Sequence, residues 1–506
     1  MIVSDKVFWR GRCDRVVPLI DGMDYFTVLA QMMEQAERRV LIVGWDFRTD
    51  TVLDPETGEP LKARFERLLR QKPELEIHVL IWDWIVGFAM DREPLIDVTL
   101  SGIDRLHFHF DSAHPPSAAH HEKIVVIDGT VGFVGGIDIT RGRIDDSRHR
   151  SDNPLLGGAH TVHDLMFMVE CAAPLALEKH VLDRWRIATG RVLDPTPPDE
   201  RRRGELAWPK EHAPWWRGVQ LAIVRTKAAL EEDPEIREIE PAIMDAIGAA
   251  RETLYIENQY FTMRSVVDAL QRQLQRHPKL EVVIVLPKMS PGLFENLVMD
   301  TSRADCVRQL RDGPHGDRVA VVYPRRVPDD GGEPHDITVH SKTMIVDDRL
   351  VMNGSANLAH RSMGLDTEVS LILEAEEDEE EARAAMRRLR MRLLGEHLGL
   401  SPEETVEALS ARPSMVGLIA ERSDATRRLE PIGVEKDGWI HEVAAAADLR
   451  SLDSDTPLDI GLPTEDDRPS SGAFRRSWFN PTRMRLTLAS AAACVILVVL
   501  VIYVLV

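Results

Sequence analysis

The 506-residue chain is poor in cysteine and in basic charge. Its four cysteines, Cys13, Cys171, Cys306 and Cys494, are far apart and form no CxxC pair. This spacing favours buried or idle thiols over a disulfide framework or a cysteine metal site. Lys and Arg number 62 against 83 Asp and Glu, and the resulting net charge of -21 argues against a nucleic-acid-binding protein.

The chain begins without the apolar run of a signal peptide, but it ends in a long uncharged one. A helix over Leu486–Val506, at about 1.5 Å per residue, would reach about 31 Å and cross a bilayer. Arginines between 475 and 485 precede it and indicate its cytoplasmic end. The sequence therefore predicts a transmembrane helix over 484–506, with the catalytic part of a cell-membrane protein in the cytoplasm. Either this helix is a tail anchor or further spans follow it.

Three segments occur twice in the same order, which indicates an internal duplication. ERRVLIVGWDF, PELEIHVLIW and HEKIVVID return as RETLYIENQYF, PKLEVVIVLP and HSKTMIVD about 210 residues later. These apolar runs are short and β-branched, as in buried strands, and helical patterns over Tyr25–Arg39 and Glu238–Arg251 precede them. The pattern predicts an α/β fold of two duplicated halves with mainly parallel sheets flanked by helices, packed as a pseudo-dimer.

Composition suggests where these parts begin and end. The first half is expected over 1–190 and the second over 219–400, with a Pro-rich connector at 191–218. A helical extension at 401–423 follows. The acidic segment 424–483 is rich in Asp, Pro and Ser, and is expected to tether the transmembrane helix flexibly.

A His-x-Lys-x4-Asp motif occurs once in each half and is the strongest chemical signal. It comprises His121, Lys123 and Asp128 in the first half, and His340, Lys342 and Asp347 in the second. In extended backbone, residues i and i+2 point to the same side, so each histidine and lysine can enter one pocket together. Burying two such cationic pairs is costly without an anion, and a phosphate between the copies would supply it.

The paired motifs resemble the HKD signatures of the phospholipase D superfamily. Further segments follow the order found in phospholipases D that act on phosphatidylcholine-like lipids: GWDF at 44–47, GGID at 135–138, HD at 163–164, YIENQYF at 255–261 and GSAN at 354–357. The resemblance covers most of residues 9–395. It implies a membrane phospholipid as substrate, hydrolysis or headgroup transfer as reaction, and phosphatidic acid as product. It implies no cofactor, no metal and no nucleic acid.

The resemblance also implies catalytic roles. One of His121 and His340 would form a phosphohistidine, while the other would protonate the leaving oxygen and then deprotonate water or an alcohol. The resemblance favours His121 as the nucleophile, although the two copies are nearly symmetric. Lys123 and Lys342 would hold the phosphate oxygens.

Four groups of residues complete the expected site. Ser355 and Asn357 would bind the phosphate through hydrogen bonds, and Asp164 and Glu368 would orient the imidazoles. Asp128 and Asp347 belong to the catalytic motif, but their distance along a strand favours a structural role. Asp138 takes the place of Asn357 in the first copy, where it is expected to be protonated, turned away or bonded to a donor.

Other functions share some of these features. A cardiolipin-synthase-like phosphatidyl transferase would use the same motifs, as would a nuclease, while a membrane scaffold would bind lipid without turnover. A zinc site among His107, His109, His114 and His120 lacks the cysteines or the HExxH spacing that would support it.

Overall fold

Strands and helices alternate through both halves of the chain in the computed structural model. The structure describes residues 2–434 and 453–457, except 84–92, 116, 157–159, 198–206, 291–298, 329–331 and 412. The first half contains β1 (Trp9–Ile20), α1 (Asp21–Met33), β2 (Arg39–Gly44), α2 (Leu61–Gln71), β3 (Glu76–Trp82), α3 (Ile96–Leu100), β4 (Leu106–Asp111), β5 (Ile124–Ile127), β6 (Val131–Gly135), β7 (Val162–His163), β8 (Leu165–Cys171) and α4 (Ala173–Thr189).

The second half repeats this succession. It contains β9 (Val219–Lys227), β10 (Ile236–Arg237), α5 (Ile239–Ala249), β11 (Thr253–Glu257), α6 (Arg264–Arg276), β12 (Glu281–Val285), α8 (Thr301–Arg311), β13 (Val319–Arg326), β14 (His335–Asp336), β15 (Thr338–Val339), β16 (Thr343–Val346), β17 (Leu350–Gly354), α9 (His360–Gly364), β18 (Glu368–Glu374) and α10 (Glu380–Leu398). Three elements follow it: α11 (Pro402–Ala411), α12 (Met415–Glu421) and β19 (Arg427–Pro431).

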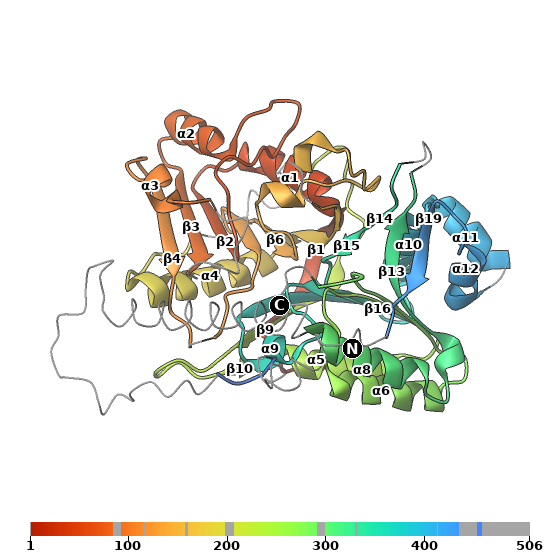
Figure 1. The fold of residues 1–506 in the computed structure, drawn as a ribbon. Coiled ribbons are helices and arrows are strands. Elements are labelled where there is room, and N and C mark those ends of the chain that lie inside the picture. Colours follow the sequence, from red (N-terminus) through yellow and green to blue (C-terminus); the bar gives the residue numbers. More distant parts are fainter. Residues whose placement is uncertain are drawn as a thin grey trace, which may run out of the picture. The chain divides into compact units, whose positions relative to one another are not determined.

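The order of the strands reveals the duplication, and Figure 1 shows the outer strands β2, β3 and β4 of the first half side by side. Outward from β1 the first half runs β8, β6, β5, β2, β3 and β4. Outward from β9 the second half runs β18, β17, β16, β11, β12 and β13, which are the counterparts in the same order. An antiparallel pairing of β1 with β9 joins the two series into one sheet.

The prediction of mainly parallel sheets is wrong. Within the described residues only the outer triplets β2–β3–β4 and β11–β12–β13 and the short pair β7–β15 are parallel, and the other pairings are antiparallel. The apolar runs that suggested parallel strands reflect burial on both faces, which helices provide whatever the direction of the strand.

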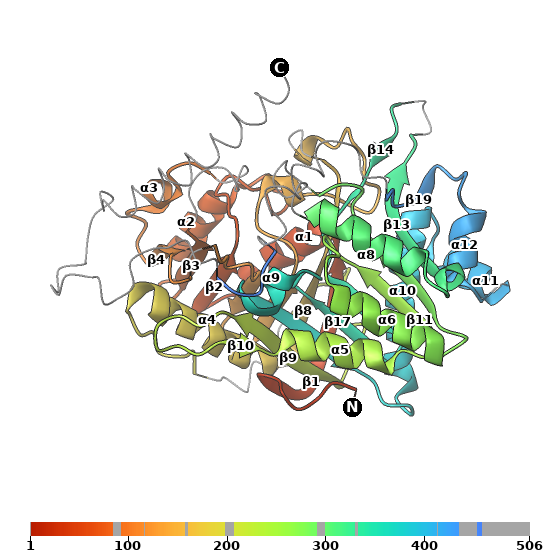
Figure 2. The same ribbon diagram turned by 60° about the horizontal axis from the view of Figure 1, so that its bottom comes forward.

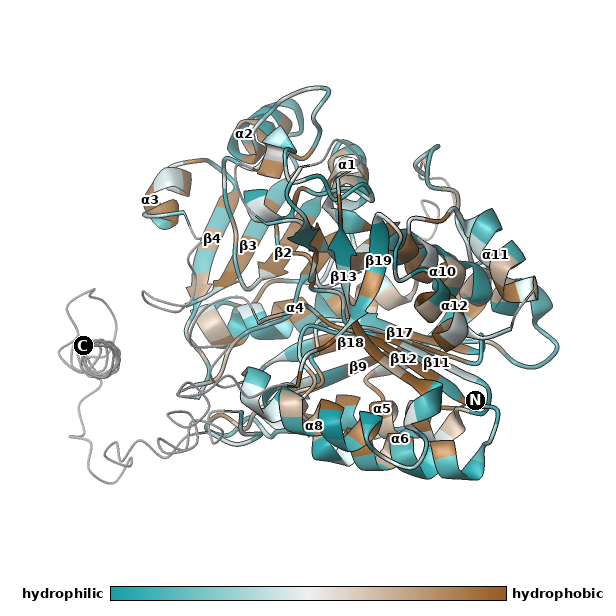
Figure 3. Ribbon diagram, turned by 45° about the vertical axis from the view of Figure 1, so that its right-hand side comes forward, coloured by the Kyte–Doolittle hydropathy of each residue, from teal (hydrophilic) through white to brown (hydrophobic). Residues whose placement is uncertain are grey.

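Helices bury both faces of the sheet. Leu61, Phe65 and Leu68 form an apolar stripe on α2 and pack with α1 against one face of the first half. The helices α5, α6 and α8 cover the second half, as Figure 2 shows. A third core cluster contains residues of α4 and α10 together with strands of both halves. In Figure 3 the strands are largely hydrophobic, whereas α6 and α8 alternate between hydrophilic and hydrophobic residues.

Two expectations about the ends of the chain meet different outcomes. Part of the predicted tether is ordered, because β19 pairs with β13 and Asp453 accepts a hydrogen bond from Thr262 at 2.5 Å. Residues 435–452 and 458–483 of the predicted tether lie outside the described residues, so the tether stays a prediction. In the part of the chain that the structure describes, no helix is both long and apolar enough to cross a membrane. The predicted transmembrane helix over 484–506 lies outside the described residues.

The expectation of idle thiols is wrong for one pair. Cys13 in β1 and Cys171 at the end of β8 form a buried disulfide with a Cα–Cα distance of 4.9 Å. The antiparallel pairing of β1 with β8 brings the two residues together across a sequence separation of 158, which spacing alone does not reveal. Cys306 is a buried free thiol, and Cys494 lies outside the described residues.

Candidate active site

Each histidine motif is held against an acid-bearing strand of the opposite half. The backbone N–H of His121 donates to Thr367 O at 2.9 Å, and that of His340 donates to His163 O at 2.8 Å. Thr367 precedes Glu368, and His163 precedes Asp164. The duplication thus places the acid of each half beside the imidazole of the other.

The two imidazoles have matching environments. His121 Nδ1 lies 3.1 Å from Glu368 Oε2, and its N–H is shared with Ser355 O at 3.0 Å. His340 Nδ1 lies 2.7 Å from Asp164 Oδ2. A carboxylate on Nδ1 fixes the ring orientation and directs Nε2 toward a reactant. These contacts pair each predicted orienting acid with a histidine, although the chain order would have paired them within a half.

Burial and positive charge both act on these imidazoles. Burial is the largest cause that holds the pKa of His121 well below its usual range, followed by the charges of Lys123 and Lys342. Burial likewise lowers the pKa of His340, with Arg143, Lys342 and Lys123 adding to the effect. Both imidazoles thus lie in the field of both lysines, which brings the two motifs into one site. Without an anion the site favours neutral imidazole.

The orienting acids respond in the opposite direction. Burial raises the pKa of Glu368 to about 8, although hydrogen bonds from Ser355 and Ser362 oppose the shift. Burial also raises the pKa of Asp164, against the charges of Lys342 and Arg143. The site is therefore dry enough that charge of either sign is costly, and a bound phosphodiester would change the protonation of several groups together.

The two lysines differ in their partners. Lys123 Nζ forms an ion pair with Asp138 Oδ2 at 3.1 Å, while Asp138 Oδ1 accepts the N–H groups of Trp45 and Asp46 at 2.9 and 3.1 Å. Asp138 is thus bonded to donors, which was one of the three expected states. Lys342 Nζ instead donates to Gln259 Oε1 at 3.1 Å, and burial lowers its pKa to about 7.

After β17, the side chain of Ser355 contacts the orienting acid Glu368. Ser355 Oγ donates to Glu368 Oε2 at 2.5 Å, and phosphate binding by this hydroxyl stays a prediction. Asn357 is buried and stays a candidate phosphate ligand. In the first half, a Cβ on Gly136 would meet Asp164 Oδ1 at 2.2 Å. The absence of a side chain at Gly136 therefore leaves room for Asp164, and Asp164 contacts His340.

The aspartates that close the motifs lie at the other end of their strands. Asp128 accepts backbone N–H groups from Glu37, Arg38 and Arg39 at 2.7–2.9 Å, and Asp347 does the same for residues 251–253 at 2.7–2.9 Å. Both therefore anchor the turn that enters β2 or β11. These contacts agree with the structural role that strand length favoured.

Arg143 is a site residue that the sequence argument missed. Its Nη2 donates to His340 Nε2 at 3.1 Å, on the imidazole nitrogen opposite Asp164. Its counterpart after the second motif is Ser362, which donates to Glu368 Oε1 at 2.7 Å. The two copies of the repeat differ at this position, with Arg143 in one and Ser362 in the other, and this difference was the signal by which the sequence could have revealed Arg143. The ring of Trp45 also lies near the site, 6.4 Å from that of His121.

Fold and site together define a duplicated α/β protein whose two histidine–lysine motifs meet where the halves join. A family model described as "Cardiolipin synthase, PLD-like domain" matches residues 243–390. Phospholipase D A of Dictyostelium discoideum is 25% identical over 76% of this chain and 35% of its own length. Phospholipase D alpha 1 of Carica papaya is 23% identical over 77% of this chain and 66% of its own. Residues 243–390 thus match a PLD-like domain, and about three quarters of the chain is similar to phospholipases D.

The relatives are distant, and this chain matches only part of the length of some of them. The chain spans about a third of the length of the Dictyostelium protein. Among solved structures, the phosphatidylserine synthase of Haemophilus influenzae Rd KW20 has a TM-score of 0.51 and 16% identity, over 80% of this chain and 94% of its own. At that identity the likeness concerns the fold.

Proposed function

We propose that the protein is a phospholipase D-type phosphodiesterase that hydrolyses glycerophospholipids or exchanges their headgroup through a phosphohistidine. The observation that carries the proposal is the pair of buried imidazoles, each held on Nδ1 by an acid of the opposite half with a lysine beside it. One neutral imidazole can attack a phosphorus atom that an anionic nucleophile would meet with repulsion.

In the first step, Nε2 of one imidazole forms a bond to phosphorus while the bond from phosphorus to the headgroup oxygen breaks. The other imidazole transfers its Nε2 proton to that oxygen, and the headgroup leaves as an alcohol. Lys123 and Lys342 balance the charge on the non-bridging oxygens. In the second step, water or an alcohol attacks phosphorus, the N–P bond breaks, and the second imidazole takes the proton of the incoming oxygen.

The surroundings of the two rings favour His121 as the nucleophile. The side chain of His121 is 16% exposed against 5% for His340, so a substrate reaches it more easily. Nε2 of His340 already accepts a hydrogen bond from Arg143. When the phosphate binds, Arg143 turns to its oxygens, and His340 can carry the proton that the leaving group needs.

A phosphatidyl transferase is the second candidate, supported by the wording of the matching family model, "Cardiolipin synthase, PLD-like domain". It would use the same phosphohistidine with a lipid alcohol as acceptor in place of water. A nuclease or a non-catalytic scaffold has less support, given the net charge of -21 and two intact motifs. We further propose a membrane location, with the substrate taken from the cytoplasmic face.

The test is turnover of the purified protein on mixed phospholipid vesicles with and without ethanol. Phosphatidic acid is expected, partly replaced by phosphatidylethanol when ethanol competes with water for the phosphohistidine. His340→Asn should give no product, whereas His78→Asn, which changes a buried histidine of β3, should stay active. Cardiolipin formed from phosphatidylglycerol would favour the transferase. The absence of every lipid product would refute both, and DNA cleavage would be assayed next.

A further inference from the structure

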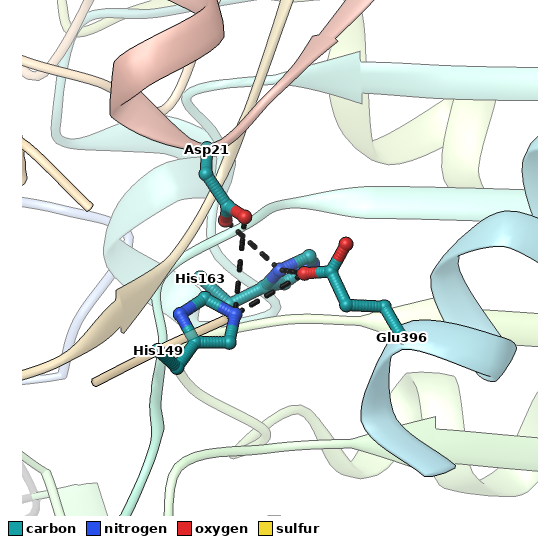
Figure 4. A group of neighbouring side chains, drawn as sticks. All are labelled: Asp21, His149, His163 and Glu396. Atoms are coloured by element: carbon teal, nitrogen blue, oxygen red, sulfur yellow. Dashed lines mark hydrogen bonds and ion pairs between the residues drawn. The ribbon is translucent and has the colours of Figure 1, made fainter. Parts of the chain in front are cut away.

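A second group of buried histidines and carboxylates lies behind the active site (Figure 4). Asp21 begins α1, His149 follows the loop that carries Arg143, His163 is in β7 and Glu396 is in α10. None of the four side chains is more than 1% exposed. The mechanism above uses none of these residues.

The four side chains face one another, and one possible ligand atom from each lies within 4.8 Å of the other three. Glu396 Oε1 lies 3.1 Å from His149 Nε2 and 3.0 Å from His163 Nδ1. Asp21 Oδ1 lies 3.1 Å from His163 Nδ1, and Asp21 Oδ2 lies 3.8 Å from His149 Nε2. Ligands around a tetrahedral ion at about 2.0–2.2 Å are about 3.3–3.6 Å apart, and these separations bracket that range.

Each imidazole is bonded to a carboxylate on its other nitrogen. His149 Nδ1 donates to Asp145 Oδ2 at 2.9 Å, and His163 Nε2 donates to Glu257 Oε2 at 3.0 Å. Such carboxylate partners fix the tautomer of histidines that bind metals. The nitrogens that face Asp21 and Glu396 lie 3.0–3.8 Å from their oxygens, where a divalent cation would replace the ring protons as the positive charge between the two carboxylates.

Asp21 supplies an independent observation. Its Oδ2 is fully buried and has no hydrogen-bond partner among the described residues. Its backbone is also in the left-handed region, with φ of 66°, which is unfavourable for a residue other than glycine. Among the described residues, the contact recorded for this oxygen is the 3.8 Å ion pair with His149, which is long enough for a metal ion to lie between the two atoms.

We propose that Asp21, His149, His163 and Glu396 bind one divalent transition-metal ion, with zinc as the best fit. Two imidazole nitrogens and two carboxylate oxygens suit zinc, whereas magnesium and calcium prefer oxygen ligands alone. Four protein ligands without solvent access are typical of a structural site. The second oxygen of Glu396 is held by Arg392 at 2.8 Å, which leaves Oε1 for the ion.

Such an ion would join the two halves beside the catalytic residues. Three ligands belong to the first half, and Glu396 belongs to α10 of the second. His163 immediately precedes Asp164, whose backbone O accepts the N–H of Asp21 at 2.8 Å. The ion would thereby fix the acid that orients His340. The inference stands without reference to which substrate the site turns over.

The test starts from the full chain in detergent, purified without chelator and freed of any affinity tag. We expect about one equivalent of metal by mass spectrometry, and X-ray absorption showing nitrogen and oxygen ligands at about 2.0–2.2 Å with two imidazoles. Removing the ion should lower the unfolding temperature, and Zn²⁺ alone should restore it. These measurements use the unmodified sequence, so misfolding of a variant cannot obscure them.

Variants then locate the site. His149→Asn and Glu396→Gln should each weaken Zn²⁺ binding more than about 100-fold, because they remove a direct ligand. His78→Asn, which changes a buried histidine paired with Glu76 at 3.2 Å, should keep the metal. A chain with less than about a tenth of an equivalent that Zn²⁺ and Mn²⁺ do not stabilise would overturn the proposal. Retention of the ion by both ligand variants would overturn it too.

Discussion

The two halves of the candidate site differ at Arg143, whose counterpart is Ser362, and in the partners of their two lysines. Arg143 contacts His340, whereas its counterpart Ser362 supports Glu368. Lys342 has the neutral amide of Gln259 as its partner, whereas Lys123 is paired with Asp138. The near-symmetric backbone therefore carries an asymmetric set of charges, which suits two histidines with different roles.

Arg143→Ala is expected to lower kcat/KM by about 100- to 1,000-fold, because it removes a charged donor near the reacting phosphate. Arg141→Ala is the matched control. Arg141 is two residues away, half exposed and paired with Asp50 at 3.0 Å, so its loss should change kcat/KM less than about threefold. Steady-state kinetics on a short-chain phospholipid measures both. Equal effects of the two substitutions would remove Arg143 from the site.

Anion binding should weaken as the pH rises through about 7, where the buried Lys342 loses its proton. Its pKa is lowered, so the charged form prevails only below that value, and ionisation of Glu368 near pH 8 adds repulsion in the same direction. Calorimetric titration with sulfate, whose charge is constant from pH 6 to 9, should show affinity falling about tenfold or more. In Lys342→Arg the midpoint should move upward; an unchanged midpoint would contradict the assignment.

At the scale of the elements, each motif runs along a short buried strand. The histidine and lysine lie at one end of the strand, and the aspartate that anchors the neighbouring turn lies at the other. His121 and Lys123 precede β5, and Asp128 follows it. The same arrangement holds for β16. A strand of four buried residues fixed at both ends gives the histidine a defined position.

Asp128→Ala tests the anchor. It leaves three backbone N–H groups without their acceptor, and should lower the free energy of unfolding by about 1–3 kcal/mol while kcat stays within about tenfold. Urea unfolding and turnover should be measured at a temperature where the variant is folded. A drop in kcat of several orders of magnitude at unchanged stability would assign Asp128 to catalysis instead.

The sequence predicted elements better than their connections. The strands β2, β3, β11 and β12 lie in the predicted apolar runs, and α5 lies within the predicted helical pattern Glu238–Arg251. The direction of pairing was missed because burial by helices on both faces gives the same apolar pattern to parallel and antiparallel strands. The Cys13–Cys171 pair was missed for a related reason, since it depends on the register of β1 against β8.

The same limit applies to the candidate site. Both motifs were predicted because they are repeated, and both acids were predicted from the resemblance to the phospholipase D superfamily. The pairing of each acid with the histidine of the opposite half was not predicted. Asp164 and His340 are 176 residues apart, and only the packed sheet brings them together. Ser355 was assigned to phosphate because a hydroxyl can serve a ligand, and its contact with Glu368 is seen only in the structure.

On the scale of the whole molecule, one chain supplies every group of the site. Mixing a His121→Asn chain with a His340→Asn chain should therefore leave activity at the background level of each variant. Each molecule would still lack one of its two histidines, and the halves are joined through β1 and β9. Assay of the mixture over a range of concentrations measures this. Recovery that grows with concentration would instead indicate a site shared between chains.

The exchange of acids between the halves has one more consequence. Because each half holds the other's catalytic ring, a small slip between β1 and β9 would loosen both imidazoles at once and leave neither able to compensate. In the proposed mechanism, turnover therefore requires that the two halves hold each other in place.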